Sequence, residues 1–154
     1  MPTGLPPDLR AELDGLLRST PLLTTLGIEL VSWLPGSATV RMTPGTDHGN
    51  LAGSVHGGIM FALADAAFEA ACNSYGRLAV ALQTSCHYSR PAKLHEPLTA
   101  GAGEVSRSHR TASYKIDVRD SNGDLCAWYM ALAYRTEKWH LGEERWPEDW
   151  RIRH

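Results

Sequence analysis

Apolar residues follow two different patterns along this chain, one before residue 75 and another after it. The segment HGGIMFALADAAFEAACNS, residues 56–74, is apolar around almost the whole circumference of a helix. A helix of that kind must be buried, so we expect 56–74 to form the central helix of the fold. From Leu78 onward the sequence alternates with period two or forms short β-rich runs. The pattern predicts four consecutive antiparallel strands, at 78–88, 97–105, 111–120 and 125–135.

The chain before the central helix predicts a short surface helix, a hairpin and a loop. Leucines recur at helical spacing at Leu9, Leu13, Leu16 and Leu17 and predict the helix. Pro21 and Gly27 favour its end. Two extended runs within 27–42 flank a Leu-Pro-Gly turn and indicate a hairpin. Residues 43–55 are rich in Gly, Thr, Asn and Asp, which is typical of a loop. One apolar helix followed by strand runs favours an α+β domain in which an antiparallel sheet wraps the helix.

The composition of the 154 residues bounds the class of protein. With 43% hydrophobic and 21% charged residues the chain is typical of one globular domain, 1–154, with a core at roughly 22–136. A net charge of −2 argues against a nucleic-acid partner. The longest apolar stretch, 56–74, contains charged residues, which argues against a membrane partner. Three cysteines without a C-x-x-C pair favour a cytoplasmic location and no metal site. We expect the Trp-rich tail, 139–154, to pack its tryptophans on the body.

One carboxylate, Asp65, sits at the centre of the predicted buried helix. An unpaired buried carboxylate costs several kcal/mol, so Asp65 needs an ion-pair partner, water or a functional cleft. At the helix start, Gly57 and Gly58 offer free N–H groups at the positive end of the helix dipole, which suit a developing oxyanion. Eight residues separate Gly57 from Asp65, about 12 Å along a helix, too far to share one reacting atom. Two copies with antiparallel central helices would bring Asp65 of one to Gly57 of the other.

A longer motif contains these residues. The string N-x-x-x-x-x-H-G-G-x-x-F-x-L-A-D-x-A-F-x-x-A-x-N-S runs from Asn50 to Ser74, and HYSRPAKLHEPL follows at 87–98. Both segments resemble the phenylacetyl-CoA thioesterase-like (PaaI-like) branch of the hotdog-fold acyl-CoA thioesterases. The resemblance implies a hotdog fold, an antiparallel sheet wrapped around one long central helix. It also implies an acyl-CoA substrate and assembly as dimers, often tetramers, with sites at the subunit interface.

The resemblance further implies roles for individual residues. The glycine matching Gly57 supplies an oxyanion-hole N–H, and the acid matching Asp65 is the catalytic carboxylate. Asn50 and His56 match residues that place water or substrate.

One position departs from the pattern of some relatives, which carry a catalytic serine on the following strand where this chain has Ala81. Gln83, Thr84 and Ser85 are polar neighbours. Alternation along a strand puts Gln83 and Ser85 on one face and Thr84 on the other, and we expect Thr84 to take the place of the serine.

Further residues are expected to bind substrate. Gly58 and Phe61 lie near the helix start, beside the expected position of the thioester and acyl group. Four cations near predicted strand ends are candidates for the CoA phosphates: Arg90, Lys93, Arg107 and Arg110. We expect no cofactor, because no Gly-rich phosphate loop, metal-ligand cluster or dinucleotide motif is present in the sequence.

These observations predict hydrolysis of an aryl- or short- to medium-chain acyl-CoA to the free acid and CoA. Asp65 either activates water or attacks the thioester directly, and Glu69, one turn on, is the rival acid. A thiolate leaves readily without a dedicated general acid. Two other functions stay open, a hotdog dehydratase or hydratase of hydroxyacyl thioesters and a non-catalytic acyl-CoA-binding module.

Overall fold

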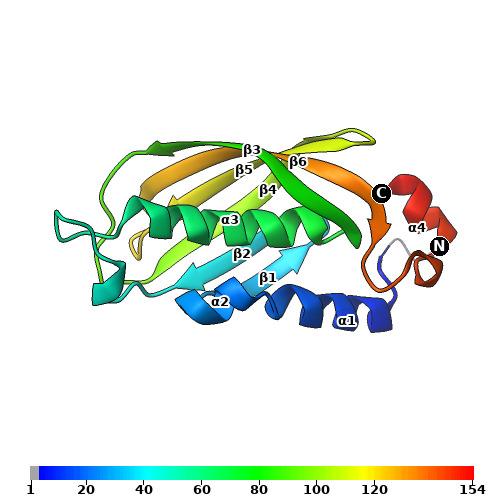
Figure 1. Cartoon of the computed structure of the whole chain (residues 1–154), viewed down its shortest axis with the longest axis horizontal. Helices are drawn as coiled ribbons and strands as arrows, with labels where there is room; N and C mark the ends of the chain where they lie inside the picture. The colour runs from blue at the N-terminus through cyan, green and yellow to red at the C-terminus, as the bar shows by residue number, and fades with distance from the viewer. Residues whose placement is uncertain (1–3) are drawn as a thin grey trace.

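A long helix, α3 (Gly57–Asn73), lies against one face of a six-stranded antiparallel sheet (Figure 1). The computed structural model describes residues 4–154. The strands are β1 (Glu29–Leu34), β2 (Ser37–Met42), β3 (Arg77–Tyr88), β4 (Leu98–Arg107), β5 (Thr111–Arg119) and β6 (Leu125–Trp139). This is the α+β arrangement that the sequence predicts. Within residues 4–154 no helix combines the length and apolar character needed to cross a membrane.

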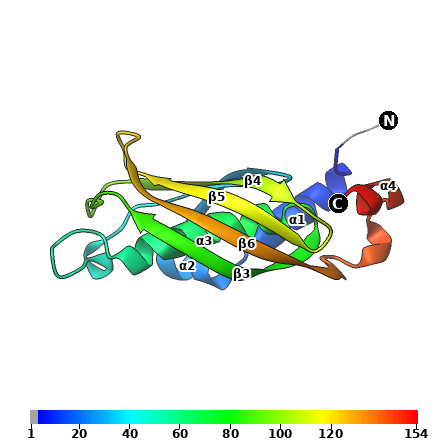
Figure 2. The same cartoon turned by 90° about the horizontal axis from the view of Figure 1, so that it is seen from above.

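The order of strands in the sheet is β1-β2-β4-β5-β6-β3. β4, β5 and β6 pair with their sequence neighbours, but β3 pairs with β6 and not with β4. The expectation of four consecutive strands is therefore wrong for β3, because residues 89–97 carry the chain across the end of the sheet to β4. β3 is an edge strand, and its outer edge has no pairing partner in the part of the chain described (Figure 2).

α3 is buried on nearly all sides because its residues are apolar around the whole helix. The Phe68 ring, for example, meets the Tyr114 ring of β5 edge-on, with 5.4 Å between ring centroids. The helix begins after an N-cap at His56. Its first turn lies beside Tyr88, the last residue of β3, whose hydroxyl donates to the carbonyl of Gly57 at 3.0 Å. The sheet therefore holds the helix N-terminus at a defined place.

Two helices precede the β1–β2 hairpin, where the sequence predicts one. α1 (Pro7–Arg18) is followed by α2 (Pro21–Leu26), because Pro21 starts a new helix, a position that suits proline. Gly27 then ends α2 in the left-handed region at φ 64°. α1 turns an apolar stripe inward, with Leu9, Leu13 and Leu17 buried. Asp14 of α1 accepts a 2.8 Å hydrogen bond from the Trp33 indole of β1, which ties the helix to the hairpin.

The C-terminal segment packs its tryptophans on the end of the body, as the sequence predicts. α4 (Glu148–Arg153) follows a short 3₁₀ turn (Glu143–Arg145). Trp146 and Trp150 are buried, and the Trp150 indole donates to the carbonyl of Tyr75 at 2.9 Å. Gly76 has φ 84°, and a Cβ there would lie 1.9 Å from the Trp146 ring. Glycine at this turn is therefore what lets the tail tryptophan approach the backbone.

Candidate active site

Asp65 lies halfway along α3 and is partly buried without an ionic partner. It borders a narrow, mainly apolar cleft between α3 and the sheet, whose other walls include Phe61, Phe68, Thr84 and Tyr129. Within residues 4–154 the carboxylate forms no ion pair and no hydrogen bond, and burial raises its pKa. A structural ion pair is thereby excluded for the described chain. Asp65 is therefore a carboxylate at the side of a cleft whose raised pKa favours uptake of a proton.

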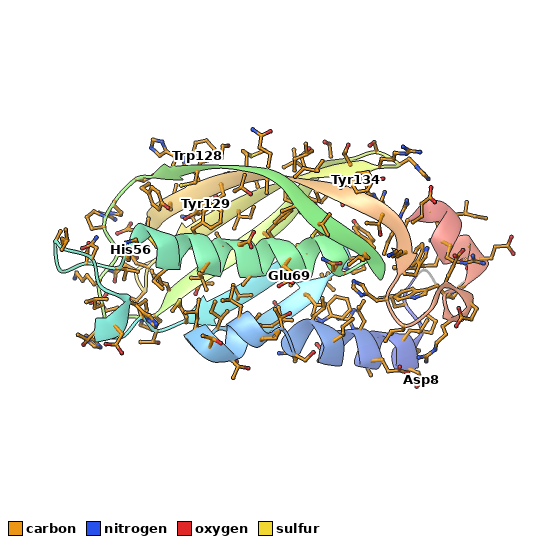
Figure 3. All side chains as sticks on the ribbon, viewed as in Figure 1. Asp8, His56, Glu69, Trp128, Tyr129 and Tyr134 are labelled. Carbon is orange, nitrogen blue, oxygen red and sulfur yellow. The ribbon has the colours of Figure 1, made fainter. Side chains whose placement is uncertain are left out.

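Glu69 lies one turn further along α3 and faces a different space. It borders a groove of about 390 Å³ between α3 and the α1–α2 segment. Desolvation raises its pKa, and the nearby charge of Asp65 raises it further. Glu69 has no ion-pair partner in the part of the chain described, so it remains the alternative candidate to Asp65 for the catalytic carboxylate. Figure 3 labels it well along the helix from His56.

The start of α3 presents one free backbone donor. The His56 ring caps the helix, because its Nδ1 accepts the N–H of Gly58 at 2.9 Å. A neutral His56 therefore carries its proton on Nε2. Of the two glycines, only Gly57 keeps an N–H without an acceptor among residues 4–154, and that group lies at the positive end of the helix dipole. The free N–H at the start of α3 is therefore that of Gly57, while Gly58 is committed to the cap.

Tyr88 covers the same turn from β3. A Cβ placed on Gly57 would lie 3.2 Å from the Tyr88 ring, a tight contact that would push the ring away by a few tenths of an ångström. Burial is the main factor that raises the pKa of Tyr88. The ring therefore forms one wall beside the free N–H of Gly57.

Tyr129 of β6 is a site residue that the sequence did not single out. Its side chain is 1% exposed, and its hydroxyl has no hydrogen-bond partner in residues 4–154. The ring meets Phe61 edge-on at 5.7 Å and Tyr88 at 6.3 Å. Figure 3 shows Tyr129 on the helix side of the sheet and Trp128 on the outer side, where Trp128 stacks on His87. An inward aromatic of an alternating strand looks like ordinary core, and only the unpaired hydroxyl distinguishes it.

Asn50 organises the loop that leads into α3. Its side-chain oxygen accepts the N–H groups of Ala52 at 2.9 Å and Ser54 at 3.1 Å. Its amide nitrogen donates to the Ser54 hydroxyl at 3.0 Å. Within one chain the Asn50 side chain therefore holds the loop in shape, close to the His56 cap.

Thr84 lies on the same face of β3 as the helix. The pairing register between β3 and β6 shifts between Ala81 and Gln83, so that Ala81 lies opposite Ala133 and Thr84 opposite Ala131. Both alanines of β6 are buried toward α3, and residues directly opposite in a pair share a face. The Thr84 side chain accordingly lines the cleft of Asp65. Because of this bulge, Thr84 lies on the same face of β3 as Ala81 and supplies a hydroxyl that Ala81 lacks.

The four candidate CoA-binding cations do not come together within one chain. Arg90 pairs with Asp124 at 2.6 Å and Lys93 with Glu96 at 3.6 Å, next to the start of β4. Arg107 ends β4 and Arg110 lies in the turn beyond it, and a ten-residue strand spans about 30 Å. The expectation that all four cations of one chain form a single phosphate-binding rim is therefore wrong, because the start and the end of β4 lie at opposite ends of the sheet.

Comparison with known proteins identifies the family of this chain. The sequence model of the thioesterase superfamily matches residues 52–127. The chain is 36% identical over 110 residues to the acyl-coenzyme A thioesterase PaaI of Escherichia coli, covering 71% of this chain and 79% of that protein. The chain belongs to the PaaI-like thioesterases.

Two solved structures extend this result to the fold of the thioesterase. The E. coli PaaI protein from the phenylacetic acid degradation operon has a TM-score of 0.80 at 30% identity, covering 86% of this chain and 94% of that one. A Streptococcus mutans protein bound to acetyl CoA has a TM-score of 0.69 at 26% identity, covering 72% and 90%. The hotdog fold implied by the motif is confirmed. The thioesterase match ends at residue 127, so most of the β6 strand, residues 128–139, and all of α4 lie beyond it.

Proposed function

We propose that this PaaI-like thioesterase hydrolyses acyl-CoA thioesters, with Asp65 as the acid–base or nucleophilic group and the Gly57 N–H as the oxyanion donor. The observation that carries the proposal is the unpaired Asp65 carboxylate in an aromatic cleft, on a helix that begins with a free N–H. Burial raises the pKa of Asp65, which suits a group that must take a proton from water near neutral pH. The Gly57 N–H and the helix dipole stabilise the charge that develops on the thioester oxygen.

The proposed site forms between two copies of the chain. Gly57 and Asp65 are about 12 Å apart along one helix, so a single chain offers either the donor or the acid to one thioester. The free edge of β3 suits pairing with a second copy. Val80 and Leu82 on that strand are 47% and 56% exposed, and Phe61 of α3 adds an exposed ring. A two-fold axis beside β3 would place Asp65 opposite Gly57 of the partner subunit in both sites. Pairs of such dimers would give a tetramer.

The lining of the cleft matches an aryl or short- to medium-chain acyl group in its chemistry, and the space within one chain, about 170 Å³, must widen to hold such a group. Phe61, Phe68 and Tyr129 are aromatic, and Ile116 adds an aliphatic wall. Apolar walls with one or two polar groups are typical of sites that bind such a substrate. The Thr84 hydroxyl would take the position of the serine found in some relatives. The reaction needs only water and substrate, since a thiolate leaves readily.

The test is thiol release from a panel of aryl-, short- and medium-chain acyl-CoAs, with the oligomeric state measured in the same samples. Asp65→Asn should abolish release while the assembly is unchanged, and Glu69→Gln should leave most of the activity. Release that survives Asp65→Asn but not Glu69→Gln would transfer the role to Glu69. Tight retention of unhydrolysed acyl-CoA by the wild type would instead favour a binding module, and hydration of an enoyl-CoA without thiol release a hydratase.

A further inference from the structure

Five arginine side chains line a hollow of about 530 Å³ between α4 and the end of the sheet. They come from four parts of the chain and are Arg77, Arg107, Arg135, Arg151 and Arg153. The remaining walls include Ser108, His109 and His154, and no carboxylate side chain from the described chain lines the hollow. Figure 1 shows α4 beyond the end of β6, far from the start of α3. The arginine hollow is thus a separate feature from the Asp65 cleft.

The positive charge of the arginine hollow is only partly neutralised. Three arginines have a carboxylate partner outside its walls, in the pairs Arg107–Glu104 (3.4 Å), Arg151–Glu143 (2.6 Å) and Arg153–Asp149 (3.0 Å). Arg77 and Arg135 form no ion pair with any group in residues 4–154 and are 7% and 6% exposed. Buried charges are normally paired. Two buried guanidinium groups without an ion-pair partner favour an anion beside them.

Arg135 gives the most direct evidence. Its Nη1 donates to the carbonyl of Ser108 at 2.7 Å, but its buried Nη2 has no acceptor in the described chain. Burial lowers the pKa of Arg135, and the neighbouring Arg77 and Arg107 lower it further. Burial, followed by the charge of Arg107, likewise lowers the pKa of His154 to about 4. Beyond burial, both groups therefore feel the positive charge of neighbouring arginines, and the charge of Glu104 acts against it at Arg135.

We propose that the arginine hollow binds a phosphate-type anion, at a site separate from the thioester site. Guanidinium groups match phosphate oxygens with pairs of parallel hydrogen bonds, and Arg135 offers a donor that the protein leaves free. The hollow is concave and local on a chain of net charge −2, which suits a small phosphate-bearing molecule. α3 spans about 24 Å between Gly57 and the end that faces the hollow. This proposal stands whether or not the protein hydrolyses acyl-CoA.

The C-terminal segment completes the site. The His154 ring stacks on Tyr75 at 4.7 Å and meets Trp150 at a tilt at 4.3 Å, and its Nδ1 lies 2.7 Å from Arg107. This stack holds α4 against the sheet, so that Arg151 faces the arginines of the body. The site therefore depends on a part of the chain that lies outside the thioesterase match.

The test is calorimetric titration of the full chain with inorganic pyrophosphate, in a buffer without phosphate. Arg135→Met and Arg151→Gln should each weaken binding about tenfold or more, the loss expected for one charge-assisted contact. The matched control is Arg41→Gln, which removes one exposed, ion-paired arginine of β2 far from the hollow. Arg151 lies on a short surface helix, so its variant keeps the test valid if Arg135→Met fails to fold.

Two sources of phosphate are distinguished by repeating the titration with CoA present. Competition by CoA would assign the arginine hollow to the nucleotide end of a CoA molecule, and independent binding would assign it to another phosphate-bearing molecule. Either result supports the site. Absence of pyrophosphate binding at millimolar concentration, or equal weakening by Arg41→Gln and Arg151→Gln, would overturn the proposal.

Discussion

Tyr129 and Tyr114 are a matched pair of buried tyrosines that differ in one hydrogen bond. Both are 1% exposed, both lie on strands facing α3, and each ring meets a phenylalanine of α3 edge-on. The Tyr114 hydroxyl donates to Glu104 at 3.0 Å, whereas the Tyr129 hydroxyl has no partner in the described chain. Replacing each by phenylalanine removes a single oxygen and leaves the packing of the ring unchanged.

The two substitutions should therefore change stability in opposite directions. Tyr129→Phe removes a buried, unsatisfied hydroxyl and should raise the free energy of unfolding by about 1 kcal/mol. Tyr114→Phe removes a hydrogen bond to a carboxylate and should lower it by about 2 kcal/mol. For a chain of this length these values correspond to shifts in Tm of about +3 °C and −6 °C.

Thermal and urea unfolding of both variants, at one protein concentration and with the oligomeric state checked, measures this difference. A Tyr129→Phe variant less stable than the wild type would refute the reasoning. It would mean that the hydroxyl meets a partner in solution, from the neighbouring Tyr88 or Cys86 side chain, from bound water or from a second copy of the chain. A Tyr114→Phe variant as stable as the wild type would remove the basis for the comparison.

Three further outcomes are expected. Burial raises the folded-state pKa of Asp65 above its ordinary value of 3.8, so the folded state binds this proton more tightly than the unfolded state and loses stability as pH rises from 3.8 through the raised pKa. In urea unfolding, the free energy of unfolding of Asp65→Asn should therefore increase relative to that of the wild type as pH rises. A difference between the two proteins that does not change with pH would contradict the raised pKa. Leu82→Lys on the free β3 edge should dissociate the assembly in sedimentation and lower activity, whereas Val105→Lys, equally apolar and 61% exposed, should do neither. Gly76→Ala places a Cβ against a tail tryptophan and should lower the free energy of unfolding by more than about 3 kcal/mol. Gly123→Ala has a similar positive φ but open space around the Cβ, and should lower it by about 1 kcal/mol. Equal losses of stability would show that the tail ring is not packed against Gly76.

Periodicity was enough to predict the central helix and the individual strands, because each depends on its own alternation of apolar and polar residues. It was not enough to place β3, because the choice of β6 as a partner depends on packing against α3. The start of α2 was missed for a similar reason, since Pro21 can either end one helix or begin the next.

The site shows the same division. Asp65 and Gly57 could be found from the sequence, because a carboxylate in an apolar helix and glycines at its start are local features. Thr84 depends on the bulge between Ala81 and Gln83, since strict alternation would put it on the opposite face from Ala81. The arginine hollow could not be predicted, because its walls come from segments far apart in the sequence.

The pairing of β3 with β6 also bears on the order in which the protein folds. Tyr88 lies opposite Ala127 and Arg77 opposite Trp139, so β3 emerges early in synthesis but has no partner until nearly the whole chain is made. β4, β5 and β6 can form by closing short loops, while β3 must wait for a long one. We therefore expect the strand with the free edge to dock last. Until it docks, β3 is unpaired on both edges, so the unfinished chain carries a strand that can pair with other copies of itself before its own β6 is made.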